Sequence, residues 1–250
     1  MNREGQISLW VAIAIVLAIV IIVFFVLNRN VLPNISTNSD DIVSSIKKCV
    51  SDSTTEAIGK MLPQGGFLEP TDYKLYNNIS ISYLCENKGD YKPCINQHPM
   101  LITEESNEIE NYISPIVDNC FNNFKANLEK QGYAISMGSM ELNVSLVPDK
   151  VNVDINREVS LTKNEKTSKT DSYHVEINSP IYDLSNVAIE IANQQAKQCY
   201  FEYVGYMFHY PRFDIRVISL SDPTRIYNIR DKNTDKEMNI AIRSCVIPSG

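Results

Sequence analysis

The chain has 250 residues, and its 30 Asp and Glu residues outnumber its 23 Lys and Arg residues, so the formal net charge is −7 and the isoelectric point lies near 5.1. The acidic residues are scattered along the chain and do not form a tail. Because proteins that bind nucleic acids usually present a basic stripe, this balance argues against a nucleic-acid partner.

The most apolar segment lies near the start of the chain. Ile7–Leu27 is a run of 21 residues without a charge, a proline or a glycine. As a helix it would span about 31 Å, the thickness of the hydrocarbon core of a bilayer. A secretory signal normally has a shorter apolar run followed by a small-residue cleavage site, and this segment has neither property. We therefore expect residues 1–30 to form a leader and a transmembrane helix that contacts membrane lipid.

The residues in front of this segment carry a family resemblance. Gly5-Gln6, followed by Ser8, resembles the class III signal of archaeal type IV pilins and archaellins. The resemblance implies cleavage between Gly5 and Gln6, retention of the helix and assembly into a filament. Trp10 stands where those pilins usually carry Glu, and Glu4 stands where their leader is usually basic. The other interpretation is an uncleaved signal anchor with Trp10 at the membrane boundary.

The next part of the chain predicts a linker, two helices and a pair of strands. Pro33 and the polar residues around it predict a linker over 31–39. Apolar residues at helical spacing predict a helix over 40–61 and a longer one over 104–131, the latter with a kink or a break at Pro115. Alternating residues predict strands over 73–76 and 78–85.

The second half reads mainly as strands. Period-two alternation predicts strands over 140–147 and 151–155, a second hairpin of 158–162 with 172–177 across a charged tip at 163–171, and a final three-strand meander over 213–218, 225–229 and 238–246. One helix, 180–200, separates these groups.

The connections between these strands are too short for crossover helices. The predicted fold class is therefore α+β, with an N-terminal transmembrane helix and an extracellular body of about three helices packed on antiparallel sheets. We divide the body near Gln131, into a helical-plus-hairpin subdomain over 40–131 and an antiparallel-sheet subdomain with one helix over 132–250.

All six cysteines lie outside the apolar segment: Cys49, Cys85, Cys94, Cys120, Cys199 and Cys245. An even number in a tethered body favours disulfides formed on the oxidising, extracellular side. Of the fifteen full pairings, local context favours Cys85–Cys94 around a turn-rich loop and Cys49–Cys120 between two helices, which leaves Cys199–Cys245. Six reduced thiols in a cytoplasmic body are the alternative.

Three Asn-x-Ser triplets begin at Asn34, Asn78 and Asn143 and are candidate glycosylation sites. About three such triplets are expected by chance in a chain so rich in Asn and Ser, so they say nothing about the compartment.

No motif for catalysis or cofactor binding is found. The three histidines lack metal-ligand spacing, and neither the Gly-x-Ser-x-Gly elbow nor a phosphate loop occurs. Asp149, Asp154, Asp231 and Asp235 fall on predicted turns and strand edges where calcium could bind, but without an EF-hand loop. We therefore predict no catalytic residue, no metal ligand and no cofactor.

The segment 200–211 is unusually aromatic. Its aromatic residues are Tyr200, Phe201, Tyr203, Tyr206, Phe208 and Tyr210. If exposed, they would form a surface for a protein partner or a glycan. The more common alternative is that they cover a sheet beside Cys199.

Together these features predict a single-pass cell-surface protein with a disulfide-stapled extracellular body, acting as a binding or structural element and not as an enzyme. Its candidate partners are itself and other surface proteins. The alternatives are a type IV pilin-like subunit and, third, a surface hydrolase. The chain also loosely resembles the single-anchored surface proteins of small-genome archaea, through Gly5-Gln6, Gln64-Gly65-Gly66 and its ending at Ala241–Ser244; that resemblance implies location only.

Amino-terminal sequencing of the native protein tests the leader. A start at Gln6 is expected if a pilin-type peptidase acts on Gly5-Gln6. A start at Met1 or Asn2 would leave an uncleaved signal anchor and would remove the basis for the pilin resemblance.

Overall fold

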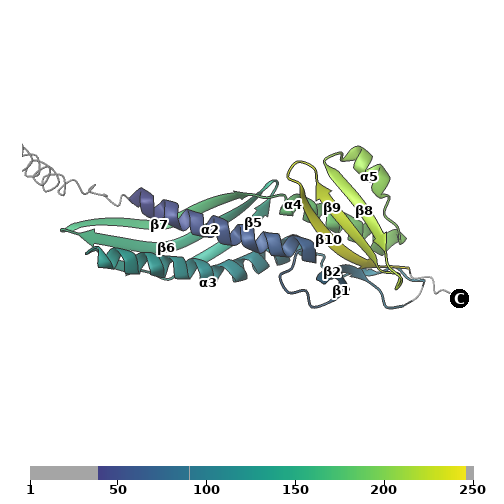
Figure 1. The fold of residues 1–250 in the computed structure, drawn as a ribbon, viewed down its shortest axis with the longest axis horizontal. Coiled ribbons are helices and arrows are strands. Elements are labelled where there is room, and N and C mark those ends of the chain that lie inside the picture. The colour runs from purple at the N-terminus through teal and green to yellow at the C-terminus, as the bar shows by residue number, and fades with distance from the viewer. Residues whose placement is uncertain (1–38, 90, 246–250) are drawn as a thin grey trace, which may run out of the picture. The chain divides into compact units, whose positions relative to one another are not determined.

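The computed structural model describes residues 39–89 and 91–245, so the predicted anchor Ile7–Leu27 lies outside the described residues. Among the helices of the described part, none has the length and apolar character that crossing a membrane requires. The contacts divide the chain into Met1–Ile42 and Val43–Gly250, and the second is one compact unit. Its fold is α+β, with two sheets and four α-helices in the described part (Figure 1).

A four-stranded sheet is built around one long hairpin. Strand β6 (Lys150–Lys163) pairs along one edge with β7 (Lys166–Asn178), and along its other edge with β5 (Glu141–Val147) and then β4 (Ala134–Met137). Alternate residues of β6 point into the core, so the expectation of one wet face per strand is confirmed.

The prediction of two separate hairpins in this region was wrong. The predicted strands 151–155 and 158–162 are one strand, interrupted by a shift of register between Asn156 and Val159. The predicted nine-residue tip is a two-residue turn, Asn164-Glu165, in which both residues have positive φ. The irregularity breaks the period-two pattern, so it resembles a strand end in the sequence. Strand β4 was not predicted.

A six-stranded sheet contains the predicted meander. Its order is β1 (Tyr73–Tyr76), β2 (Ile79–Glu86), β10 (Lys236–Arg243), β9 (Arg225–Asp231) and β8 (Phe213–Ser219), and the short β3 (Ile95–Asn96) also pairs with β2. Strands β10 and β2 are parallel, which corrects the expectation of purely antiparallel sheets. The argument from short connections does not apply to them, because the remainder of the fold separates them in sequence.

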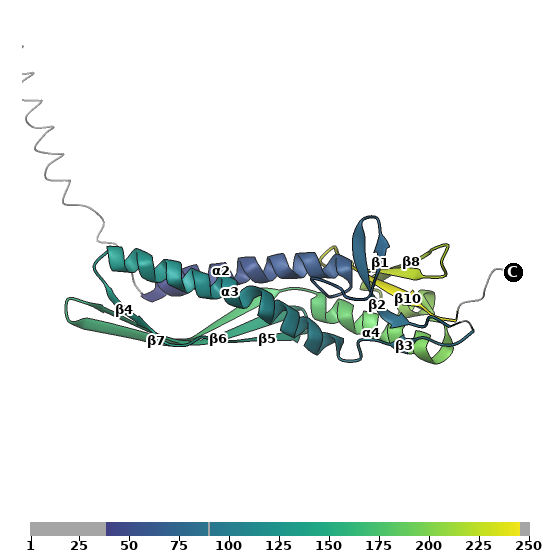
Figure 2. The ribbon, with the colours of Figure 1, turned by 90° about the horizontal axis from the view of Figure 1, so that it is seen from below.

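Two antiparallel helices, α2 (Ser39–Met61) and α3 (Leu101–Lys130), lie together on one side of the four-stranded sheet (Figure 2). The Tyr112 hydroxyl of α3 lies 2.9 Å from Glu56 Oε1 and 2.8 Å from Lys60 Nζ, both of α2. Of the two outcomes predicted at Pro115, a kink or a break, the break was wrong, because α3 is a single helix. Pro115 is exposed, so the carbonyl that its missing N–H leaves unpaired can be hydrated.

All six cysteines form disulfides, and the pairs are those that the sequence favours: Cys49–Cys120, Cys85–Cys94 and Cys199–Cys245. The first joins α2 to α3. The second closes the loop after β2, and the third ties the end of helix α4 (Ile181–Gln198) to the chain after β10.

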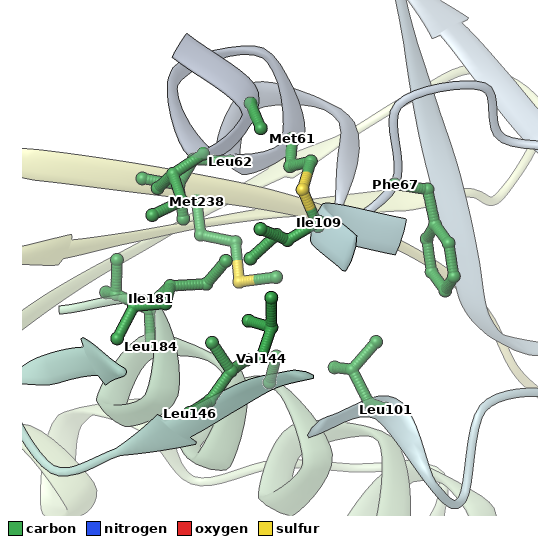
Figure 3. Packing of buried hydrophobic residues seen from close by; sticks show 14 of the residues in the cluster. Met61, Leu62, Phe67, Leu101, Ile109, Val144, Leu146, Ile181, Leu184 and Met238 are labelled. Carbon is green, nitrogen blue, oxygen red and sulfur yellow. The ribbon is translucent and has the colours of Figure 1, made fainter. Parts of the chain in front are cut away.

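One hydrophobic core continues through both sheets, with α4 at its centre. Figure 3 shows side chains from several helices and strands meeting there, among them Leu146 of β5, Leu184 of α4 and Met238 of β10. The boundary predicted near Gln131 falls between α3 and β4, which are in contact within this unit.

Glu105 of α3 is fully buried within this core. Both of its carboxyl oxygens lie 2.7 Å from Ser185 Oγ of α4, which is also 2.7 Å from the Ile181 carbonyl oxygen. The Ser185 hydroxyl is the donor to all three oxygens, and because it has a single proton these bonds only partly compensate for the burial of the Glu105 carboxyl. Burial accordingly raises the pKa of Glu105 well above its usual value.

This carboxyl should make the protein less stable at alkaline pH. Because the pKa of Glu105 is higher in the folded chain, its stabilising contribution is complete below the unfolded pKa of about 4.3 and is lost as the pH rises toward the folded value. Glu105→Gln keeps the hydrogen-bonding capacity but cannot ionise. The free energy of unfolding of this variant should therefore fall less between about pH 5 and pH 8 than that of the wild type. Each pH unit by which the pKa of Glu105 is raised corresponds to about 1.4 kcal/mol of this difference. Denaturant unfolding at several pH values measures this. Glu110→Gln on the same helix is the control, and equal slopes for both variants would contradict the prediction.

Candidate functional site

Helix α5 (Tyr203–His209) forms within the aromatic segment and was not predicted. Glu202 caps it, because its Oε1 accepts a hydrogen bond from the Gly205 N–H at 3.3 Å. The Tyr200 hydroxyl donates to the other carboxylate oxygen of Glu202 at 2.5 Å, and these bonds lower the pKa of Glu202. The cap therefore stays ionised at neutral pH.

One side of the aromatic segment is attached to the core. Phe201 is 1% exposed, and its ring centre lies 5.3 Å from that of Tyr206 and 6.4 Å from that of Tyr227 on β9. The sulfur of Met207 accepts the Ile215 N–H of β8 at 3.1 Å. These contacts fix α5 against the sheet edge and leave its other side in solvent.

The solvent side of α5 is apolar. Val204 and Phe208 are one helical turn apart, and Phe208 is 82% exposed. Tyr200, before the helix, and Tyr210, after it, are also exposed. An exposed Val-Phe pair flanked by two tyrosines is typical of a contact surface.

Two disulfides hold further exposed apolar residues on neighbouring loops. Cys85–Cys94 closes the loop that carries Tyr91, and Ile95 follows directly. The Cys245 N–H donates to the Lys92 carbonyl oxygen at 3.0 Å, so this loop is attached to the Cys199–Cys245 disulfide that precedes Tyr200. We call the exposed residues of these segments the stapled surface: Tyr91, Ile95, Tyr200, Val204, Phe208 and Tyr210.

The structure separates the six aromatic residues that the sequence singles out. Tyr200, Phe208 and Tyr210 are exposed, Tyr203 and Tyr206 are half-buried, and Phe201 is in the core. The segment therefore has an exposed part, as a partner surface would, and a buried part that covers the sheet. Val204, Tyr91 and Ile95 were missed, because single apolar residues in a sequence do not show on which side of the backbone they lie.

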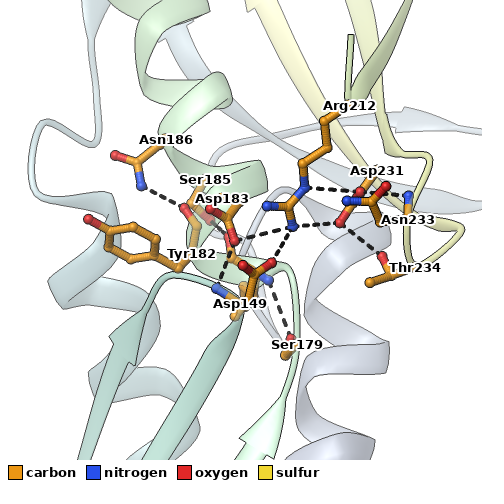
Figure 4. Close-up of polar contacts among 11 residues, drawn as sticks. Asp149, Ser179, Tyr182, Asp183, Ser185, Asn186, Arg212, Asp231, Asn233 and Thr234 are labelled. Carbon is orange, nitrogen blue, oxygen red and sulfur yellow. Dashed lines mark hydrogen bonds and ion pairs between the residues drawn. The ribbon is translucent and has the colours of Figure 1, made fainter. Parts of the chain in front are cut away.

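A polar junction lies on α4, where the two sheets meet (Figure 4). Arg212, between α5 and β8, donates to Asp149 in the β5–β6 turn at 2.6 Å and, through two nitrogens, to Asp231 of β9 at 2.8 and 3.1 Å. Its Nη2 also lies 3.4 Å from Asp183 in the first turn of α4. One guanidinium thus joins carboxylates from both sheets and the central helix.

Asp231 is completely buried. Burial opposes its ionisation, but hydrogen bonds from Arg212 and from the Asn233 N–H lower its pKa below the usual value. The contacts to Asp231 and Asp149 in turn raise the pKa of Arg212. The junction is thus held by a bidentate charge-assisted pair.

The Asp235 N–H donates to the Asp231 carbonyl oxygen at 2.8 Å, but of the four aspartates considered for calcium only Asp149 and Asp231 direct their carboxylates at the same group. Asp149 and Asp231 share Arg212, whereas Asp154 lies 2.6 Å from His174 Nδ1 and Asp235 pairs with Arg230. Within residues 39–89 and 91–245, no group of three or more His, Cys, Asp or Glu side chains is placed to hold a metal ion.

The remaining predicted sites are dispersed. Gly5, Gln6 and Asn34 lie outside the described residues. Asn78 is exposed in the β1–β2 turn, where it and Asn77 have positive φ, and Asn143 is exposed on β5. Comparison of the chain with protein-family models, curated proteins and solved structures finds no match.

Replacing Arg212 should weaken the whole unit. Arg212→Ala leaves the buried Asp231 carboxylate without its cation, which should lower the free energy of unfolding by about 3 kcal/mol. Arg216→Ala removes an exposed arginine that pairs with Asp214 at 3.1 Å and should cost less than about 1 kcal/mol. Denaturant unfolding at neutral pH compares the two, and equal losses would show that the junction is not important for stability.

Proposed function

We propose that the chain is a single-pass cell-surface protein, anchored by Ile7–Leu27, whose body binds a protein partner through the stapled surface. The observation that carries the proposal is that exposed apolar side chains gather on segments held by two disulfides and by the cap of α5. Aromatic side chains contribute a large share of binding energy at protein interfaces.

The disulfides support this function in two ways. They favour an oxidising compartment, consistent with a body outside the cell. They also limit the motion of the loops that carry Tyr91 and Tyr200, so less conformational entropy is lost when these residues are immobilised by a partner.

The placement of α5 supports binding more than catalysis. Its exposed side presents apolar atoms, and its ionised residue, Glu202, is engaged by Tyr200 and Gly205. Such a surface provides contact area and orientation and offers no nucleophile next to a general base.

Binding of the purified full-length protein, fluorescently labelled and held in neutral nanodiscs, to the surface of native cells tests the proposal. Val204→Asp with Phe208→Asp should weaken binding about tenfold or more, because losing one or two hot-spot contacts costs at least about 1.4 kcal/mol. Both positions are exposed, so the fold should persist, which circular dichroism checks.

Tyr73→Asp with Leu75→Asp is the matched control. These residues are also exposed and apolar but lie on β1, away from the disulfide-held segments. Unchanged binding by the first pair, or equal losses for both pairs, would contradict a role for the stapled surface.

A further inference from the structure

Strand β8 forms one edge of the six-stranded sheet, and α5 lies beside it (Figure 1). The Lys232 N–H donates to the Arg212 carbonyl oxygen at 2.9 Å, and the neighbouring residues Asp231 and Phe213 are directly opposed. Such a pair is flanked by hydrogen bonds and makes none itself. Phe213 and every second residue after it therefore direct their main-chain N–H and C=O groups away from β9, toward the outer edge.

The outer edge of β8 is occupied in its first half and free in its second. The Ile215 N–H donates to the sulfur of Met207 on α5 at 3.1 Å. Among the residues that the structure describes, none accepts the outward N–H of Val217 or of Ser219. Sheet edges are usually protected by a lysine, a proline or a bulge, and Val217–Ser219 has none of these.

An apolar row crosses the outer face of the sheet and ends at this free edge. Tyr83, Ala241, Ile226 and Ile218 are opposed in turn on β2, β10, β9 and β8. The first three are at most 6% exposed, whereas Ile218 is 36% exposed. The row is thus covered along its length except at its last residue, where one more strand would complete it.

The neighbouring row on the same face is polar. It consists of Asn239, Asn228 and Arg216, again opposed in turn. Arg216 and Ile218 form the β8 wall of a hollow of about 330 Å³ that lies over both rows. A strand added beside β8 would therefore place alternate side chains at the rim of this hollow, one next to Ile218 and one next to Arg216.

We infer that β8 binds an extended peptide segment of a partner protein as an added antiparallel strand. The free part of the edge, Val217–Ser219, is about 10 Å long, which suits a short segment but is small against the roughly 800 Å² per partner that a stable dimer buries. Antiparallel pairing is the more stable arrangement per residue. The inference does not depend on the stapled surface, whose residues lie outside β8.

The two rows specify the side chains of this segment. The residue opposite Ile218 continues the apolar row, so it is aliphatic, and the residue two positions further, opposite Arg216, is polar. The residue between them exchanges main-chain hydrogen bonds with Val217. In this mode of recognition the main-chain bonds give affinity and the alternate side chains give specificity.

Fluorescence anisotropy of a labelled peptide with the purified full-length protein tests the inference. The peptide Ser-Thr-Leu-Val-Asn-Thr-Ser places its Leu, Val and Asn opposite Ile218, Val217 and Arg216. It should bind with a Kd below about 1 mM. Replacing its Leu by Ser, or methylating the main-chain nitrogen of its Val, should each weaken binding about tenfold, because the first removes the apolar contact and the second a main-chain hydrogen bond.

A pair of proline variants tests the edge itself. Val217→Pro removes an N–H that β9 does not use, so the fold should persist, which circular dichroism checks, while peptide binding weakens tenfold or more. Leu75→Pro is the matched control at the opposite edge of the sheet. Its N–H also points outward, because the Tyr83 N–H donates to the Asp72 carbonyl oxygen at 3.0 Å around an opposed pair of β1 and β2. Leu75→Pro should leave peptide binding unchanged.

Three results would overturn the inference. The first is the absence of saturable peptide binding up to about 1 mM. The second is binding that Val217→Pro leaves unchanged or that both proline variants weaken equally. The third is self-association of the wild-type chain that Val217→Pro abolishes, without peptide binding, which would assign the edge to a second copy of the chain.

Discussion

The arrangement of this protein depends on a single guanidinium group. Arg212 binds Asp149 from the four-stranded sheet, Asp231 from the six-stranded sheet and the edge of α4 through Asp183. Because Asp231 is buried, its charge needs the hydrogen bonds from Arg212 and from the Asn233 N–H, and Arg212 is its only cationic partner among the described residues. The continuous core beneath this junction supplies most of the stabilisation, as apolar burial does in general, while the ion pair fixes how the two sheets meet.

This constraint gives the unit two different ends. The tip of the β6–β7 hairpin belongs to the four-stranded sheet, whereas the stapled surface carries exposed apolar residues on disulfide-held segments beside the six-stranded sheet. If the junction is rigid, a contact at one end sets the direction of the other.

Much of the fold could be predicted from the sequence because its signals are local. The stripes of α2, α3 and α4 follow helical spacing, the meander of β8, β9 and β10 alternates cleanly, and the disulfides follow from the residues around each cysteine. The misses have physical causes. The register shift at Asn156 interrupts the alternation as a strand end would. Pro115 does not break α3, because it lies on an exposed face where water can replace the lost hydrogen bond. The parallel pairing of β2 with β10 joins segments that are distant in the chain and has no local sequence signal.

The candidate site was harder to predict from the sequence than the fold. Its aromatic richness was evident, but which aromatic residues are exposed depends on how Phe201 and Met207 attach α5 to β8 and β9. Tyr91 and Ile95 join the site only through disulfides and the Cys245–Lys92 hydrogen bond. The Arg212 junction could not be predicted from the sequence either, because its three carboxylates come from segments that are distant in the chain.

Hydrogen exchange of the full-length protein measures the rigidity on which this account depends. If the two sheets form one cooperative unit, the slowest amides of Val151–Ile155 in β6 and of Ile226–Asp231 in β9 should exchange with the same opening free energy and the same dependence on denaturant. An opening free energy for one sheet that is lower by more than about 2 kcal/mol, with a smaller denaturant dependence, would show that the sheets unfold separately and would contradict the account.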